Sequence, residues 1–380
     1  ALVVGQRHPA LRSLSDTMVR AGTAHLLSIS GLHLGIFLGV VFLACRLLLL
    51  SPRRAAAVVL VVLAAYVLLA EPRAPLLRSA VMAACLCVGL LRGRRYMLLN
   101  ALAAAAILLL VLDPRQLFAA GFQLSFTIVA ALVLFLGPAR RALFGRWLRR
   151  RGLVVFRGPD RLRRWLYYVA GDAVTYAVTA SLLAYLAAAP LVAYHFGLFN
   201  PYAPLLSLLL LPLVVAVVVP GYLAMALAWP MPNLSWQFGR AGRAAAAGLE
   251  RAVELVGELP ALSVSLRPIP AGWVLLCFGV LLLVALRQRL PFGRAAGVAG
   301  LVLLAAATAW TQRPAGRRAG AALHLLDVGS GQCAVLRTPA GRTVLLAAGG
   351  PGGHAHRRTL GPFLRHMRFA GPSAVVLSHA

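Results

Sequence analysis

Long apolar blocks separated by short arginine-containing segments restrict the fold of this chain more than any other feature of its sequence. A run of about 18 or more apolar residues is typical of a helix that crosses a lipid bilayer. The blocks occupy residues 25–50, 55–70, 76–91, 96–112, 122–137, 166–195, 203–229, 271–286 and 295–310. Several are short for a hydrocarbon core of about 30 Å, so their ends are approximate. The alternation predicts a mainly α fold, a polytopic bundle of transmembrane helices.

The composition agrees with a protein that is solvated by lipid. Hydrophobic residues make up 61% of the 380 residues and charged residues 12%, whereas soluble domains average roughly 45–50% apolar and 25% charged residues. All 38 basic residues are arginine, and the net charge is +29. The aqueous edges of such a protein attract anions. Lipid phosphates and nucleic-acid backbones are both candidates, and charge alone does not choose between them.

The arginines also predict an orientation, because cytoplasmic loops of membrane proteins are enriched in Lys and Arg. Alternation of the helices brings three arginine-rich segments to one side, which we assign to the cytoplasm: residues 46–54, 92–95 and 140–164. The C-terminal half follows the same rule if residues 203–229 enter the bilayer and return without crossing it, which Pro212 and Pro220 would permit. The C-terminal segment would then lie outside the cytoplasm.

The composition changes after residue 318, where short apolar runs separated by glycine replace the long blocks. The sequence PAGR between two such runs predicts a β-hairpin. Residues 359–369 are expected to form a helix, and AVVLSH another strand. We therefore expect a lead-in segment, a transmembrane domain, a last transmembrane helix with a linker, and the start of a soluble α/β domain: residues 1–20, 21–290, 291–318 and 319–380. The chain lacks an initiator methionine, and we expect it to be a piece cut at both ends.

Polar residues gather at the head of the first block, in the sequence HLLSISGLHLG. Such groups are costly in lipid unless they face the bundle interior or a wet cavity, and glycine permits close helix approach. Two interpretations remain open, a hydrogen-bonded packing seam and the lining of a polar pathway. A bound metal is less favoured than either, because the two histidines are eight residues apart and no carboxylate is near. The candidate pathway residues are His25, Ser28, Ser30, Gly31, His33 and Gly35.

A second group of polar residues lies between residues 71 and 126. Arg78 lies about one turn inside an apolar helix, where it either snorkels to the interface or contacts an ion partner or anion. Asn100 is expected to bond across helices. Gln123 and Ser125, in GFQLSF, again place polar groups at the mouth of a span. We add these four residues to the candidate pathway.

Taken together, HLLSISGLHLG, the RSAVM helix, the RGRR loop and LDPRQLFAAGFQLSF resemble the ComEC family of competence proteins. The resemblance covers roughly residues 1–290. It implies a multi-pass channel in the bacterial inner membrane that admits single-stranded DNA during transformation. The partners it implies are single-stranded DNA, the lipid bilayer, other proteins of the competence machinery and further copies of the chain.

The C-terminal segment resembles the start of the metallo-β-lactamase-like domain that follows the channel in this family. The family pattern LDVGQGDA corresponds to LDVGSGQCA here, and VLIDAG corresponds to VLLAAG. Gln332 and Ala347 thus replace two usual aspartates, and only His379 stands where the metal motif begins. The resemblance implies a divalent metal in an intact domain. No cofactor is evident in this chain, which we do not expect to be catalytic as it stands.

Two further functions remain as alternatives. One is a membrane-anchored hydrolase or nuclease of the metallo-β-lactamase fold, which residues beyond Ala380 would decide. The other is a small-solute transporter with broken helices around a midplane site, which Gly31, Gly35, Pro212 and Pro220 would suit, although the sequence has no visible inverted repeat.

Overall fold

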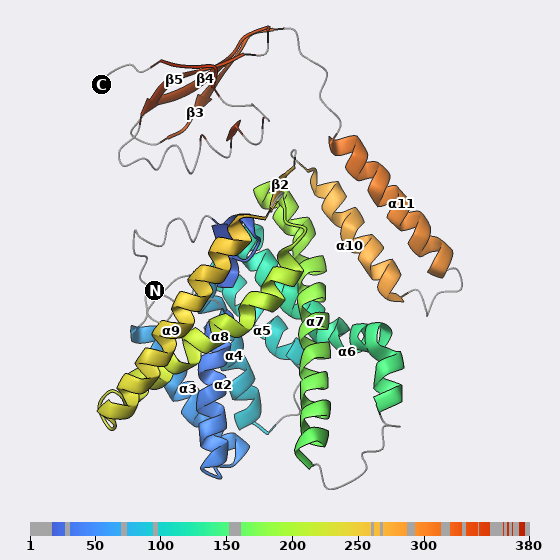
Figure 1. Ribbon diagram of the computed structural model, residues 1–380. Helices are drawn as coiled ribbons and strands as arrows, with labels where there is room; N and C mark the ends of the chain where they lie inside the picture. The colour runs from blue at the N-terminus through green and yellow to red at the C-terminus, as the bar shows by residue number, and fades with distance from the viewer. Residues whose placement is uncertain are drawn as a thin grey trace. The chain divides into compact units, whose positions relative to one another are not determined.

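The computed structural model describes residues 17–26, 31–69, 74–93, 98–151, 161–259, 262–266, 269–286, 293–312, 320–328, 332–340, 342–349, 360, 363–364, 367 and 372–376 (Figure 1). The described residues are mainly helical, which confirms the mainly α, polytopic fold with a small C-terminal sheet. By their contacts they form two units. Residues 1–191 and 200–263 belong to the first unit, and residues 192–199 and 264–380 to the second.

The first unit is built from helices. Their bounds are η2 (Ala24–Leu26), α2 (Gly31–Leu47), α3 (Pro52–Leu69), α4 (Ala74–Leu91), α5 (Leu98–Leu112), η3 (Pro114–Phe118), α6 (Ala120–Arg151), α7 (Arg161–Phe196), α8 (Ala203–Leu227) and α9 (Pro232–Gly257). The helix α7 continues from this unit into the second. Among the described residues, three helices are long and apolar enough to cross a bilayer: α6, residues 167–196 of α7, and α8.

Consecutive helices α2, α3 and α4 share one apolar core. Leu34 and Leu38 of α2 pack with Ala56 and Leu63 of α3 and with Leu76 of α4. The chain turns from α2 to α3 through Leu49, whose φ of 58° lies in the left-handed region. The guanidinium of Arg46 donates to the carbonyl of Leu50 at 2.7 Å, which satisfies a carbonyl in this turn.

The start of α6 is fixed by a short 3₁₀ turn. Asp113 caps η3, because its carboxylate accepts from the backbone N–H of Arg115 at 3.2 Å and Pro114 occupies the first helical position. The chain then enters α6 at Ala120. The predicted span ended at residue 137, but α6 continues through Pro138 to Arg151. The first part of the arginine-rich segment of residues 140–164 is therefore helical up to residue 151, because arginine and alanine favour a helix and one proline removes only one backbone hydrogen bond. Its cytoplasmic side stays a prediction.

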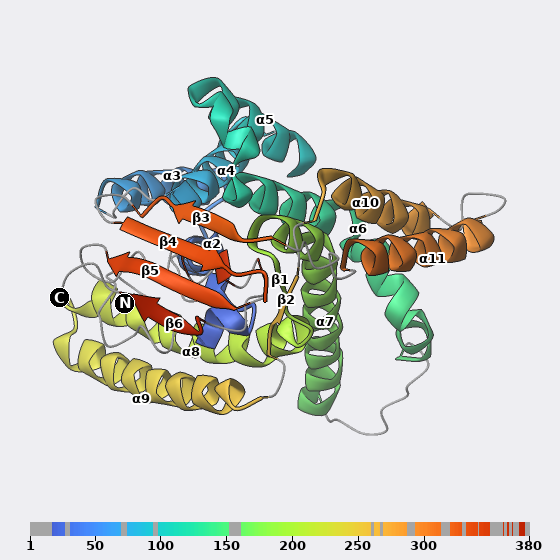
Figure 2. The ribbon, with the colours of Figure 1, turned by 90° about the horizontal axis from the view of Figure 1, so that it is seen from above.

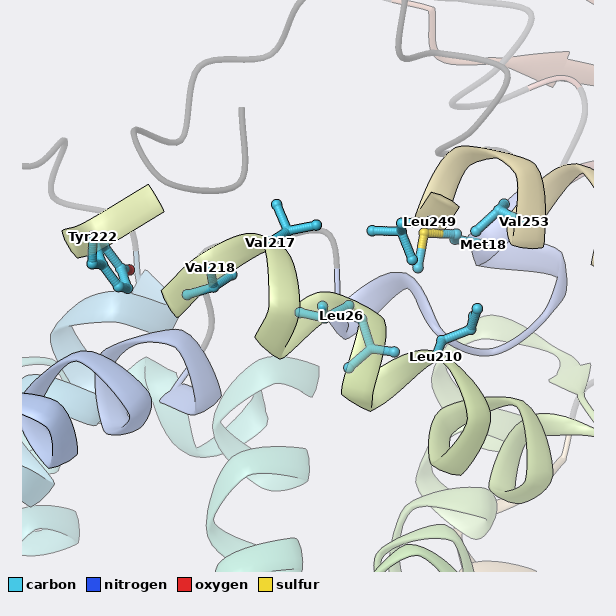
Figure 3. Close-up of a cluster of buried hydrophobic side chains, with 9 residues drawn as sticks. Met18, Leu26, Leu210, Val217, Val218, Tyr222, Leu249 and Val253 are labelled. Carbon is cyan, nitrogen blue, oxygen red and sulfur yellow. The ribbon is translucent and has the colours of Figure 1, made fainter. Parts of the chain in front are cut away.

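The helices α8 and α9 lie side by side and enclose part of the lead-in segment (Figure 3). Met18 and Leu26 are almost fully buried among Leu210 of α8 and Leu249 and Val253 of α9. The helix α9 is amphipathic, because it has one apolar face on this core while its arginines and glutamates are exposed. The described end of the lead-in segment, residues 17–20, and the residues that follow it up to Leu26 thus contribute to the core of the first unit.

The prediction that residues 203–229 enter the bilayer and return is wrong. One continuous helix, α8, extends from Ala203 to Leu227 with Pro212 and Pro220 inside it. A turn at the bilayer centre would expose several unpaired backbone groups to lipid. A proline inside a helix frees one carbonyl, and neighbouring helices compensate for it. The continuous helix therefore has the lower free energy in lipid. The side of the membrane that holds the C-terminal segment stays a prediction.

The second unit contains a helical hairpin and two sheets. The helices α10 (Ala271–Leu286) and α11 (Gly293–Gln312) lie side by side (Figure 1). The indole N–H of Trp273 donates to the hydroxyl of Thr308 at 3.0 Å across this pair. The strands β1 (Leu198–Phe199) and β2 (Val264–Ser265) pair antiparallel.

The C-terminal strands form a four-stranded sheet in the order β3-β4-β5-β6 (Figure 2). Their bounds are β3 (Ala322–Leu326), β4 (Gln332–Arg337), β5 (Thr343–Gly349) and β6 (Ala374–Val376). The strands β4 and β5 are antiparallel neighbours, which confirms the predicted hairpin, and β6 pairs parallel to β5. Cys333, Val335 and Leu345 pack with Leu360 on one face. Most of the helix predicted over residues 359–369 lies outside the described residues.

Candidate functional site

A close approach between α2 and α4 begins the candidate site. Gly31 is the first residue of α2, and a Cβ atom placed on it would lie 2.6 Å from the hydroxyl oxygen of Ser79 in α4. Real Cβ atoms do not come this close to another atom, so the approach depends on glycine at this position. The Ser79 hydroxyl donates to the carbonyl of Pro75 at 2.9 Å.

Arg78, the neighbour of Ser79, is buried where α4 meets α6. Only 7% of the surface of this residue is exposed. Its Nε donates to the hydroxyl of Ser125 in α6 at 3.3 Å. Among the described residues, no carboxylate forms an ion pair with Arg78. A buried guanidinium has a high free energy unless an anion compensates its charge. The predicted alternative of snorkelling to the interface does not fit this burial.

Two features of α6 hold this arrangement. Gly121 lies over the guanidinium, since a Cβ atom there would be 2.9 Å from an Arg78 nitrogen. The side chain of Gln123 donates from Nε2 to the carbonyl of Leu117 at 2.9 Å and so ties α6 to the η3 turn. We call Gly31, Arg78, Ser79, Gly121 and Ser125 the Arg78 site. The structure thus brings together two of the predicted residues, Arg78 and Ser125, and places a third, Gly31, against Ser79, which follows Arg78 in α4.

The remaining predicted residues are placed as follows. His33 is fully buried in α2, whereas Gly35, half a turn further, is exposed and has open space where a Cβ would be. His25, on η2, is exposed, and so is Asn100 on α5. The predicted bond of Asn100 across helices stays a prediction. Ser28, Ser30 and His379 lie outside the described residues.

A charged network connects α6 and α7, and it was not predicted from the sequence. Arg140 donates from Nε to the Thr175 hydroxyl at 3.0 Å and pairs with the carboxylate of Asp172. Arg151 pairs with the same oxygen at 2.6 Å, and its carbonyl accepts from the Tyr168 hydroxyl at 3.1 Å. The signal was available, because Asp172 is a lone acid close to the start of an apolar block, and such residues usually pair. We call Arg140, Arg151, Asp172 and Thr175 the arginine clamp.

The C-terminal sheet gives a test of the metal site that the family resemblance implies. Metal ions of this class need several His, Asp or Cys ligands that converge on one point. In the part of the chain that the structure describes, no three such residues come together. His324 instead stacks on Phe363, with ring centroids 5.1 Å apart, and Cys333 is in the apolar core. The described residues alone do not form such a site, and a metal in an intact domain stays a prediction.

Comparison with known proteins decides the family. A family model described as Competence protein matches residues 2–292, well over half of the chain. The chain belongs to the competence protein family. The match includes every residue of the Arg78 site and of the arginine clamp. The resemblance noted in the sequence is therefore confirmed for the helical part of the chain, and the metallo-β-lactamase-like assignment of the C-terminal segment stays a prediction.

Two curated relatives are similar to this competence-family chain. It is 27% identical to ComE operon protein 3 of Bacillus subtilis (strain 168) over 240 residues, which cover 63% of this chain and 27% of that protein. It is 35% identical to Competence protein ComA of Neisseria gonorrhoeae over 165 residues, 39% of this chain and 23% of that protein. The chain therefore spans about a quarter of the length of these relatives. No solved structure matches it significantly.

The chemistry available at the Arg78 site is anion binding rather than covalent catalysis. A guanidinium presents five N–H donors in a planar fork and keeps its charge under all physiological conditions. Ser125 occupies one of the donors of Arg78. In surroundings of low dielectric, the remaining donors attract a phosphate or carboxylate more strongly than they would in water.

Proposed function

We propose that the helical part of this competence-family chain lines a path through which single-stranded DNA crosses the bacterial inner membrane, with Arg78 contacting the DNA phosphates. The observation that carries this proposal is the buried guanidinium of Arg78, 7% exposed, without a carboxylate partner among the described residues. Membership of the family supports a role in competence and DNA uptake.

A passing phosphodiester chain is a suitable counter-ion for such an arginine. Each nucleotide brings one negative charge, so a strand that moves through the bundle renews the partner of Arg78 at every step. Conduction requires contacts that are strong enough to admit the strand and weak enough to release it. One arginine held by a neutral hydroxyl meets this requirement better than an arginine already paired with a carboxylate, because the paired charge would repel the incoming phosphate.

Uptake of labelled DNA by cells tests the proposal. We expect that R78Q in the full-length protein lowers the uptake of labelled DNA by about ten-fold or more, since one charge-assisted hydrogen bond contributes about 1.5–3 kcal/mol. R78K keeps the charge and loses the fork, and its uptake should be intermediate. Ser125→Ala, which frees the guanidinium but keeps its charge, should change uptake less than R78Q.

The matched control is R92Q. Arg92 follows the same helix at its other end and is exposed. R92Q also removes one positive charge, but from an exposed side chain. The uptake of DNA should therefore stay close to that of the unchanged protein. Normal uptake by R78Q, with the protein inserted in the membrane at its usual level, would remove Arg78 from the path.

A further inference from the structure

The ends of α6 and α7 enclose an open groove outside the Arg78 site. Its volume is about 430 Å³, and its walls are Phe144 and Trp147 of α6 and Tyr167, Ala170, Gly171 and Val174 of α7. The walls are almost entirely apolar. We call this feature the α6–α7 groove. An apolar groove between two candidate membrane spans is suited to a hydrocarbon chain, because its walls are as apolar as a lipid tail and pack against it by van der Waals contact.

Contacts between the two helices keep the groove in shape. Trp147 packs so closely against Gly171 that a Cβ atom on this glycine would lie 2.5 Å from the indole ring. The guanidinium carbon of Arg151 lies 5.3 Å from the centre of the Trp147 ring, and the same guanidinium forms an ion pair with Asp172. The groove is thus built by the same residues that hold α6 to α7, and it does not depend on a mobile loop.

Unpaired positive charge lies beside this groove. Arg146, Arg149 and Arg150 occupy the last turns of α6 and are exposed. Among the described residues, none of the three forms an ion pair, whereas Arg140 and Arg151 share the carboxylate of Asp172. Two arginines on one aspartate leave the clamp with a positive charge as well. This arginine-rich end of α6, next to the rim formed by Trp147, therefore attracts anions from the aqueous side.

Aromatic and aliphatic side chains place this rim at a lipid surface. Trp165 is 58% exposed on the first turns of α7, and Leu143 and Val174 are also exposed beside the groove. Trp and Tyr are enriched where spans leave the hydrocarbon core, and basic pockets between spans bind the head groups of anionic lipids. Single-stranded DNA also binds arginines and aromatic rings, so oligonucleotide binding at this groove is the competing outcome of the test below.

From this combination we infer that the α6–α7 groove binds an anionic phospholipid. One acyl chain lies against Trp147, Ala170 and Val174, and the head-group phosphate lies near the end of α6 that carries Arg146, Arg149 and Arg150. The inference does not rest on DNA translocation. Such a lipid would bridge α6 and α7 on the side that the arginines predict to be cytoplasmic, where anionic lipids are most effective.

Lipid binding by the purified full-length protein tests the inference, with phosphatidylglycerol and phosphatidylcholine as probes and native mass spectrometry as the measurement. We expect retention of phosphatidylglycerol over phosphatidylcholine. A170F fills the groove without a change of charge and should abolish the preference. A173F is the matched control, because Ala173 is exposed on α7 but does not line the groove, and it should bind normally.

A second pair of variants tests the charges. R146Q/R149Q/R150Q should weaken phosphatidylglycerol binding by about five-fold for each arginine removed at low salt. R46Q/R53Q/R54Q removes the same number of arginines at the turn between α2 and α3 and should leave binding unchanged. Equal retention of both lipids, or equal losses in the paired variants, would overturn the inference. So would a loss of single-stranded oligonucleotide binding in A170F while its lipid binding stays normal.

Discussion

At the residue scale, Gly31 and Arg78 show how one position can decide the geometry of a membrane site. Gly31 lets α2 approach the hydroxyl of Ser79, and Gly121 leaves room for the Arg78 guanidinium. Neither glycine is needed for a positive φ, so their role is close approach. A side chain at either position would push its helix away from α4 and alter the environment of Arg78.

Substitution of Gly31 tests this packing. G31A should lower the apparent Tm in detergent, since a Cβ placed 2.6 Å from the Ser79 hydroxyl must displace it, and overpacking costs about 1–3 kcal/mol. G35A is the matched control in the same helix. It meets open space and should raise the Tm slightly, because alanine favours a helix more than glycine.

A double variant makes the test specific. In G31A/S79A the nearest remaining atom is the Cβ of residue 79 at 3.4 Å, which is an ordinary contact, so most of the lost stability should return. An equally low Tm in the single and double variants would contradict the proposed contact.

Cys333 provides a prediction about pH in the C-terminal sheet. Burial raises the pKa of its thiol above the ordinary value of 9.0. The native sheet therefore keeps this proton at a pH where the unfolded chain releases it, and the free energy of unfolding should fall as the pH rises above 9.0. Alkylation by iodoacetamide at pH 9, followed by mass spectrometry, should be several-fold slower in the folded protein than in urea. Equal rates would mean that the thiol is accessible.

At the element scale, charged side chains as well as the contact of Trp147 with Gly171 hold α6 to α7. The clamp residues are carried by the second half of α6 and the first half of α7, where Asp172 accepts from two arginines. Arg140 is also 3.9 Å above the ring of Tyr176, a cation–π contact. The side chain of Arg140 is only 11% exposed, so loss of its partner leaves a charge largely shielded from water.

Removal of the Asp172 charge should therefore loosen this pair of helices. D172N is expected to destabilise the protein by about 2 kcal/mol, since it weakens two charge-assisted hydrogen bonds. Thermal unfolding in detergent measures the effect. The control is E254Q, which breaks the exposed pair between Arg251 and Glu254 and should change the stability by less than about 0.5 kcal/mol. A D172N protein as stable as E254Q would show that the clamp contributes nothing.

Elements were more predictable from the sequence than their ends and contacts. Apolar periodicity located the helices and the β4–β5 hairpin, because lipid and glycine turns impose strong local patterns. It did not predict the full length of α6 or the continuity of α8. In both helices a proline was expected to end or interrupt the helix, but unpaired backbone groups in lipid have a higher free energy than a proline inside a helix. Arg78 and Ser125 were singled out as polar residues in apolar helices. Their mutual contact depends on how α4 packs against α6, which no local pattern encodes.

At the scale of the whole molecule, membership of the competence family and the three candidate spans agree with a membrane protein. The chain spans about a quarter of its curated relatives, so activity belongs to the full-length protein. The Arg78 site and the α6–α7 groove use different residues and different anions. A variant of one should leave the other intact, which permits the DNA and lipid proposals to be tested separately.

Photocrosslinking of DNA during uptake tests the central claim most directly. Single-stranded DNA carrying 5-iodouracil, and stalled by a bulky group at its trailing end, would be irradiated in cells that contain the full-length protein. Peptides joined to DNA are then identified by mass spectrometry. We predict adducts in α4 and the start of α6, around residues 79–92 and 120–139, and their loss in R78Q but not in R92Q. Adducts confined to residues outside the helices, with the same yield in R78Q, would contradict a DNA path past Arg78.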